Sequence, residues 1–365
     1  MKLREILLFV FVTIIAATLL INAPATMVAT REAIRNCMVS VVPSLMAFMI
    51  VTSFVSESSC GDTIGRILPT RLLFNLPRSC GKVVLLSMLG GYPCGAKMIT
   101  TMLKKNEIDT KTAQRMLCFC INPSPAYVIS AIGIGLFDNA KIGAIIWISH
   151  VFTALVIGIV FRGKPIAEKT TQHTHRPLSD IFVKSVLDST NTMIAISGFV
   201  ITFSVVLTFL RQTGVTDFAT NALNFLTKDE ATSRALFDTF FDVVVGSKTC
   251  LDCPPITAVM LCAGAVSFGG ISIISQVVYL LSGQNIKFLR IILFRFVHAV
   301  LTVATVYIII NITDTEIATA ILIGSNVTNA PTNYITTMLF VLCCACFLVV
   351  SDKNISTLAQ RRIKQ

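Results

Sequence analysis

The sequence is poor in charged residues, which make up only 13% of its 365 positions. A typical soluble domain carries about 25% charge, so this composition cannot supply a water-exposed surface. Hydrophobic residues instead make up 54% of the chain, and the mean hydropathy is +0.78. The composition therefore predicts a polytopic α-helical membrane protein and excludes a soluble enzyme.

Motifs of enzymes and nucleic-acid binders are also missing. The sequence has no Walker loop, no dinucleotide-binding glycine pattern and no His-Glu-x-x-His helix, so we expect no catalytic residues and no cofactor. The net charge is +11, but the basic loops lack the aromatic interleaving typical of nucleic-acid recognition. Most of the 12 cysteines lie in apolar runs, where they pack as small hydrophobic residues. Cys250 and Cys253 lack the further ligands of a tetrahedral metal site.

The sequence contains apolar runs that are long enough to be the transmembrane helices that the composition predicts. Each has about 16 to 25 residues, close to the ~20 that a helix needs to cross a bilayer core. We expect the first to be retained as a helix, because its apolar core is longer than the usual ~7–15 residues of a signal peptide. The expected spans are 6–21, 37–55, 116–135, 142–161, 193–210, 255–280, 291–310 and 334–350.

The distribution of basic residues predicts the orientation. With both termini in the cytoplasm, the cytoplasmic segments contain 22 Lys and Arg and the opposite side contains 6, which agrees with the positive-inside rule. Lys97 and Lys248 are then the two basic residues left at membrane depth. The cytoplasmic segments are 1–5, 56–82, 104–115, 162–188, 281–295 and 351–365, and the opposite ones are 22–36, 137–141, 211–234 and 311–316.

An internal repeat is indicated by three short matches that recur in the same order at offsets of 151, 144 and 148 residues. The matches are Gly95-Ala96-Lys97 with Gly246-Ser247-Lys248, Met116-Leu117-Cys118 with Met260-Leu261-Cys262, and Ser149-His150-Val151 with Val297-His298-Ala299. Segments 83–103 and 235–254 each begin and end on one side of the membrane, and the two sides are opposite. The expected fold is all-α, with two inverted-topology repeats that each contain a re-entrant hairpin and a broken helix, or about eight spans plus two hairpins.

This threading divides the chain into six parts. They are an N-terminal transmembrane helix and connector (1–36), repeat 1 (37–161), a cytoplasmic linker (162–188), repeat 2 (189–310), a C-terminal span (311–350) and a basic cytoplasmic tail (351–365).

Interruptions of the apolar runs predict the binding site. Non-helical backbone at membrane depth is tolerated where it lines a cavity or is buried in protein, and half-helix ends there can hold an ion. The breaks lie at residues 90–95, 122–125 and 267–270. A break in isolation is more often a packing kink, but these three recur at repeat-related positions. The expected substrate-binding residues are Gly91, Pro93, Gly95, Lys97, Asn122, Pro123, Ser124, Pro125, Gly246, Lys248, Ser267, Gly269, Gly270 and Gln276.

Several polar residues have two interpretations. Lys97 and Lys248 either bind an anion or extend to the membrane interface. Asp242, inside an apolar stretch, either binds a coupling ion or pairs with Lys248. Gln276 suits a substrate contact and an ordinary helix–helix hydrogen bond equally well, and His150 and His298 are more often packed residues than a proton relay.

Three motifs carry a family resemblance: Val42-Pro43-Ser44-Leu45, Gly91-Tyr92-Pro93-Cys94-Gly95-Ala96-Lys97 and Asn122-Pro123-Ser124-Pro125-Ala126. They resemble the YlbJ-type sporulation integral membrane proteins, over about 37–350. The resemblance implies a nucleoside-recognition or gate domain, with repeats similar to those of concentrative nucleoside transporters. It also implies transport of dipicolinic acid across the outer forespore membrane of an endospore former.

These observations favour a membrane transporter of a small organic anion, with dipicolinate as the leading substrate. One alternative is a cation-coupled nucleoside carrier, and another is a non-transporting membrane protein of sporulation assembly. The expected partners are the anion and the lipid bilayer, with no nucleic acid, and a homo-oligomer stays open. The expected location is the bacterial cell membrane or the outer forespore membrane.

Overall fold

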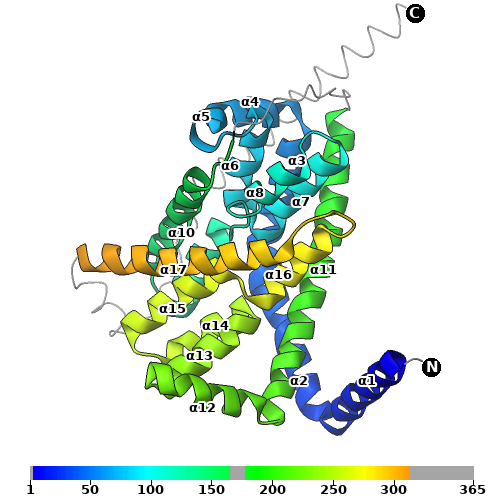
Figure 1. Ribbon diagram of the computed structural model, residues 1–365, viewed down its shortest axis with the longest axis vertical. Helices are drawn as coiled ribbons and strands as arrows, with labels where there is room; N and C mark the ends of the chain where they lie inside the picture. The colour runs from blue at the N-terminus through cyan, green and yellow to red at the C-terminus, as the bar shows by residue number, and fades with distance from the viewer. Residues whose placement is uncertain (1–2, 165–176, 313–365) are drawn as a thin grey trace, which may run out of the picture.

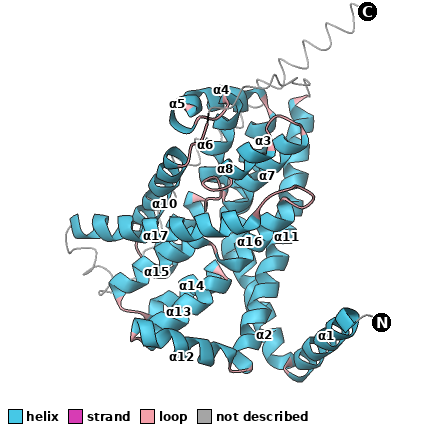
Figure 2. Ribbon diagram, in the orientation of Figure 1, coloured by secondary structure: helices cyan, strands magenta, loops and turns pink. Residues whose placement is uncertain are grey.

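The computed structural model describes residues 3–164 and 177–312 of the chain, and Figure 2 shows that these residues form helices and connecting loops without a strand. This confirms the all-helical class. Five helices are long and apolar enough to cross a membrane, as expected of an integral membrane protein. The expected span 334–350 and the tail 351–365 lie outside the described residues, so the count of eight spans stays a prediction. The five are Ala23–Glu57, Ala140–Val160, Leu178–Gln212, Pro255–Leu280 and Phe288–Ile312.

The N-terminal part is more continuously helical than expected. After α1 (Leu3–Ile21), the segment expected to be a connector forms α2 (Ala23–Asn36), which continues through a π-helical turn, η1 (Cys37–Val41), into α3 (Val42–Glu57). Pro43 has no N–H for an intrahelical bond. The wider π turn just before it is one way that a helix accommodates such a defect without ending.

The first half continues in short pieces. They are α4 (Ser59–Ile67), α5 (Thr70–Phe74), η2 (Arg78–Cys80), α6 (Gly81–Gly90), α7 (Tyr92–Lys104), α8 (Thr110–Met116), η3 (Ala126–Ile134), α9 (Gly135–Phe137) and α10 (Ala140–Val160). The expected span 116–135 is not one helix, because residues 117–124 have no helical conformation. Pro123 and Pro125, which cannot donate backbone hydrogen bonds, explain why the helix stops there.

The second half begins with the long helix α11 (Leu178–Gln212). It continues with α12 (Val215–Thr227), α13 (Glu230–Phe241), α14 (Val243–Thr249), η4 (Cys250–Asp252), α15 (Pro255–Phe268), α16 (Gly270–Leu280) and α17 (Phe288–Ile312). The α2–α3 helix packs along α11, whereas α17 runs across them in Figure 1 and packs on α10 and α15. α4 and α5 lie at one end of the molecule and α12 at the other (Figure 1).

The interior between these helices is apolar and includes most of the cysteines. Every described cysteine is unpaired, and all of them except Cys60 are buried, which is the packing role that the sequence predicts. Glycine permits the closest helix contacts. A Cβ on Gly95 would lie 1.7 Å from the carbonyl oxygen of Cys120, so only glycine lets α7 pack directly on the irregular segment 117–124.

Candidate functional site

The three predicted interruptions are all present as breaks between helices. Gly91, with φ of +88°, separates α6 from α7, and the irregular segment 117–124 separates α8 from η3. Gly269 and Gly270, with φ of +84° and +72°, separate α15 from α16. These glycines hold positive φ values that other residues rarely adopt. The sequence therefore located the breaks correctly.

His150 on α10 joins two of the breaks. Its Nε2 lies 3.0 Å from Asn122 Oδ1 and its Nδ1 lies 2.8 Å from Ser267 Oγ. An amide oxygen only accepts, so Nε2 carries the proton and Nδ1 accepts from the serine hydroxyl. Asn122 Nδ2 in turn donates to Phe119 O at 3.0 Å and to Ser87 Oγ at 3.3 Å. Asn122 and Ser267 thus belong to one buried network.

His298 on α17 packs directly on His150, with ring centroids 4.2 Å apart. Its Nε2 donates to the backbone oxygen of His150 at 3.0 Å. One turn further along both helices, the hydroxyls of Thr153 and Thr302 are 2.8 Å apart. Since both histidines are fully buried and bonded to protein groups, their contacts agree with the packed interpretation that the sequence favoured.

Arg295 is the functional candidate that the sequence analysis missed. It was counted in the cytoplasmic segment 281–295, but it lies on α17 with 1% of its surface exposed. Its guanidinium donates to the backbone oxygens of Ile121, Phe268 (3.1 Å) and Val266 (3.4 Å). Lys97 and Lys248 are therefore not the only basic residues at depth. An arginine four residues after the start of the apolar run 291–310, and three residues before His298, was the available signal.

The guanidinium of Arg295 stabilises both breaks at once. Its acceptors are backbone oxygens that the interruptions at 117–124 and 269–270 leave without helical partners. Tyr92, the first residue of α7, adds a bond from its hydroxyl to Val266 O at 2.7 Å, and its ring lies 5.8 Å from the guanidinium carbon. No ion pair joins Arg295 to a carboxylate within residues 3–164 and 177–312. A buried cation thus stands beside the breaks with only neutral partners.

A small cavity lies next to this centre and is called the carboxylate cavity below. Its free space is about 30 Å³, room for a bare ion or one or two waters but not for dipicolinate. Asp242 and Gln276 provide its most polar side chains, and both are buried. The predicted site residues Pro93 and Ser124 also line it. The other lining residues are Val41, Leu45, Tyr92, Tyr127, Ile196, Val200, Val243, Val244 and Ile273.

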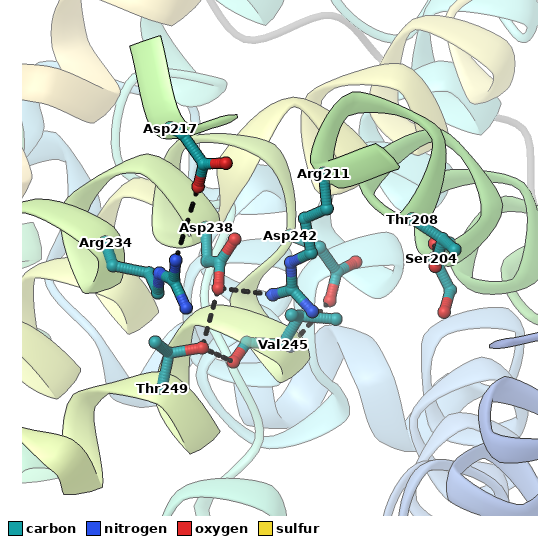
Figure 3. A network of polar contacts seen from close by, with 9 residues as sticks. All are labelled: Ser204, Thr208, Arg211, Asp217, Arg234, Asp238, Asp242, Val245 and Thr249. Atoms are coloured by element: carbon teal, nitrogen blue, oxygen red, sulfur yellow. Dashed lines mark hydrogen bonds and ion pairs between the residues drawn. The ribbon is translucent and has the colours of Figure 1, made fainter. Parts of the chain in front are cut away.

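Asp242 is held in place by the first turn of its own helix and lies one turn after a separate ion pair. It caps α14 through Oδ1, and one turn earlier Asp238 binds Arg211 of α11 at 2.6 Å and Thr249 at 2.7 Å (Figure 3). Arg234 and Asp217 form a second, exposed pair at 3.4 Å. Asp242 forms no ion pair with Lys248, the alternative that the sequence left open, within the described part of the chain.

The two predicted lysines lie in different surroundings. Lys97 is half-buried, donates to Asp188 O at 2.9 Å and to Thr192 Oγ1 at 3.2 Å, and lines a second cavity of about 70 Å³. Lys82, Lys105 and Lys184 also line it, so we call it the lysine cavity. Lys248 is exposed, donates to Asn36 Oδ1 at 2.8 Å and lines neither cavity. The structure does not bring the two lysines together.

The remaining predicted glycines contact protein rather than a cavity. A Cβ on Gly246 would lie 2.5 Å from Thr239, so Gly246 lets α14 fold back on α13. A Cβ on Gly270 would lie 3.0 Å from the backbone of Phe241, next to Asp242. These positions explain the glycines by close packing of backbone on backbone. Gly270 in particular sets the α15–α16 break against the start of α14.

Comparison with known proteins supports the resemblance found in the motifs. The chain is 25% identical to the sporulation integral membrane protein YlbJ of Bacillus subtilis (strain 168) over 320 residues, which cover 79% of this chain and 78% of the relative. No protein-family model matches the chain, and no solved structure matches it.

Proposed function

We propose that this chain is a non-enzymatic carrier of a small organic anion in the membrane of a sporulating cell, with dipicolinate as its leading substrate. The observation that carries the proposal is Arg295, a fully buried guanidinium between two helix breaks without a carboxylate partner in the described residues. An ionisable group buried in a membrane protein usually marks a transport pathway. The sporulation context rests on the YlbJ relative, and dipicolinate on the motif resemblance.

The chemistry of Arg295 suits a carboxylate ligand. A guanidinium has more N–H donors than the three bonds to backbone oxygens use, and its planar fork matches a carboxylate. The carboxylate cavity is too small for dipicolinate, so the breaks must separate to admit it. Breaks of this kind, which replace helical hydrogen bonds by side-chain bonds, are where transporter helices bend.

The lysine cavity also favours an anion, because four lysines line it against the three carboxylates of Glu57, Glu107 and Asp188. Lys105 and Lys184 both pair with Glu57, at 3.5 and 3.6 Å, whereas the ammonium of Lys97 binds only neutral oxygens within the described residues. Lys97 thus has charge available for an anion. It lies on α7, the helix that begins at the Gly91 break and carries Tyr92 beside Arg295.

Binding by purified, reconstituted protein tests the proposal. We expect labelled dipicolinate to bind and to be displaced by other aromatic dicarboxylates, but not by uncharged nucleosides, because a buried cation discriminates by charge. Uridine or adenosine binding more tightly than any dicarboxylate would replace the proposal by the nucleoside carrier, for which Asp242 is the ion ligand. A folded protein that binds neither class supports the assembly protein.

We propose further that the chain has two inverted repeats and cytoplasmic termini. The order of the elements supports the repeat. In the first half, the broken pair α6–α7 is followed by the break at 117–124 and then by α10. In the second half, the broken pair α13–α14 is followed by the α15–α16 break and then by α17. Segments assigned to opposite sides of the membrane, 56–82 and 211–234, also include helices at opposite ends of the molecule, α4–α5 and α12 (Figure 1).

Single cysteines in a cysteine-free background test this topology. Lys164→Cys replaces an exposed residue in the segment 162–188, which is assigned to the cytoplasm, and Asn221→Cys replaces one in the segment 211–234, which is assigned to the opposite side. We expect a membrane-impermeant maleimide to label Lys164→Cys only from the cytoplasmic side and Asn221→Cys only from the other side, because the repeats are inverted. Labelling of both positions from one side would eliminate the inverted repeat.

A further inference from the structure

The carboxylate of Asp242 uses one oxygen and leaves the other free. Oδ1 accepts from the backbone N–H groups of Val244 (2.8 Å) and Val245 (3.0 Å). Oδ2 is buried and has no hydrogen-bond partner in the structure, and the residue is 2% exposed. A buried charge without a partner is strongly unfavourable, so such an oxygen points to a missing counter-charge.

α16 presents two further free polar groups to the same place. Ser272 and Gln276 are four residues apart and so lie on one face of the helix. The Ser272 hydroxyl lies beside the Asp242 carboxylate without hydrogen-bonding geometry, and both amide atoms of Gln276 also lack partners. The side chains are 0% and 3% exposed. Free oxygens on a carboxylate, a hydroxyl and an amide are the ligand types that hard cations prefer.

The charge around the cavity fixes the charge of the ligand. Asp242 is the only carboxyl group among the described residues that line the carboxylate cavity, and no Lys, Arg or His lines it. Asp238, which faces it from one turn earlier, is neutralised by Arg211 at 2.6 Å (Figure 3). Arg295, the buried cation next to this cavity, directs its guanidinium to backbone oxygens and forms no ion pair with Asp242 in the described residues. The carboxylate therefore lacks a direct counter-ion, and the cavity has room for a cation without a full hydration shell.

We propose that Asp242 Oδ2, Ser272 Oγ and Gln276 Oε1 form a site for a monovalent metal cation, Na⁺. Its ligands come from the two sides of a close contact, because Gly270 sets the start of α16 against the junction of α13 and α14. The ion would therefore hold the α15–α16 break against Asp242. A role of the bound Na⁺ in substrate transport rests on the proposed carrier function. The existence of the Na⁺ site rests only on the positions of these three side chains.

Equilibrium binding of ²²Na⁺ to the purified full chain tests the site, with choline chloride holding the ionic strength constant. We expect one Na⁺ per chain in the absence of any organic anion. Asp242→Asn keeps a good helix cap and removes the charge, and it should weaken Na⁺ binding at least about tenfold, as expected on losing a charged ligand. Gln276→Leu should weaken it several-fold.

Two matched controls separate the site from general stability. Asp238→Asn removes the other buried carboxylate of α13, and Ser185→Ala removes a buried, unpartnered hydroxyl on α11 outside the cavity. Both should leave the Na⁺ affinity of the folded protein within about threefold of the parent, since neither group is a ligand. Ser185→Ala keeps the comparison valid if Asp238→Asn does not fold.

The results distinguish this site from the carrier proposal. The Na⁺ site is refuted if the folded parent protein binds no ²²Na⁺, or if Asp242→Asn binds Na⁺ with parental affinity. Proton uptake without Na⁺ binding would also refute it. Dipicolinate binding that persists in those cases leaves the carrier proposal standing. Na⁺ binding that depends on Asp242 in a protein without affinity for dipicolinate supports the site and refutes the anion carrier.

Discussion

Replacing Arg295 with glutamine is expected to lower the melting temperature of the purified protein by several degrees and to abolish measurable dipicolinate binding. The change removes a side chain that is 1% exposed and donates to three backbone oxygens. The oxygens of Ile121 and Phe268 lose their side-chain donor, whereas Val266 O keeps the Tyr92 hydroxyl. Each buried oxygen left unsatisfied costs about 1–3 kcal/mol, so a loss of roughly 2 kcal/mol or more of unfolding free energy is expected. Thermal unfolding in detergent and equilibrium binding measure the two effects.

Arg290→Gln is the matched control for this variant. Arg290 lies five residues earlier on the same helix, is exposed, and stacks on Phe294 with its guanidinium carbon 5.6 Å from the ring centroid. We expect less than about 1 kcal/mol from its replacement, as for exposed charges in general. Arg295→Lys keeps the charge but not the planar fork, and should retain part of the binding.

The two proposed roles of Arg295 can fail separately. A stable Arg295→Gln protein would show that the guanidinium does not hold the breaks together. A destabilised variant whose folded fraction still binds dipicolinate with parental affinity would keep the structural role and remove the substrate-binding role. In the second case the observation that carries the anion carrier would be lost.

Replacing Lys97 with glutamine is expected to weaken dipicolinate binding by about 1.5–3 kcal/mol, the range for hydrogen bonds to charged groups. Lys97 lines the lysine cavity, and within the described residues its ammonium hydrogen-bonds to the backbone oxygen of Asp188 and the hydroxyl of Thr192. An anion is therefore the natural partner for its charge. Lys97→Arg should also impair binding, because a planar fork does not replace a compact ammonium.

Lys248→Gln should change the affinity much less, by under about 1 kcal/mol. The sequence predicted equal roles for the two lysines, but Lys248 is exposed and binds Asn36. Lys105→Gln controls for general electrostatic attraction, since Lys105 lines the same cavity and is half-exposed and paired with Glu57. Equal losses for Lys97→Gln and Lys105→Gln would mean that the cavity attracts anions without a specific contact. Parental affinity in Lys97→Gln would remove Lys97 from the site.

The helix breaks show how far local sequence reasoning reaches. Proline removes a backbone donor and glycine permits positive φ, and both effects act within a few residues. The sequence could therefore place the interruptions at Gly91, at 122–125 and at 269–270. The same reasoning treated 22–36 as a connector, although residues 23–36 form α2.

The polar partners could not be predicted in this way. Lys97 and Lys248 occupy matching sequence positions, yet one lines a cavity and the other is exposed. Arg295 was counted in the cytoplasmic segment 281–295, although its guanidinium donates to the backbone oxygen of Ile121, 174 positions away. A side chain's burial depends on which distant segment packs over it, and a local pattern has no information about that.

The sequence by itself determined that this protein lies in a membrane, is built of helices and has broken helices at named residues, because hydropathy and backbone chemistry are properties of short segments. Only the tertiary structure decided which polar groups meet: Arg295 with both breaks, His150 with Asn122 and Ser267, and Asp242 with Ser272 beside a cavity that Gln276 also lines. Each of these contacts joins segments at least 27 positions apart. Their free energy comes from burying charge and hydrogen-bonding groups together, which requires the packed helices to be in place first.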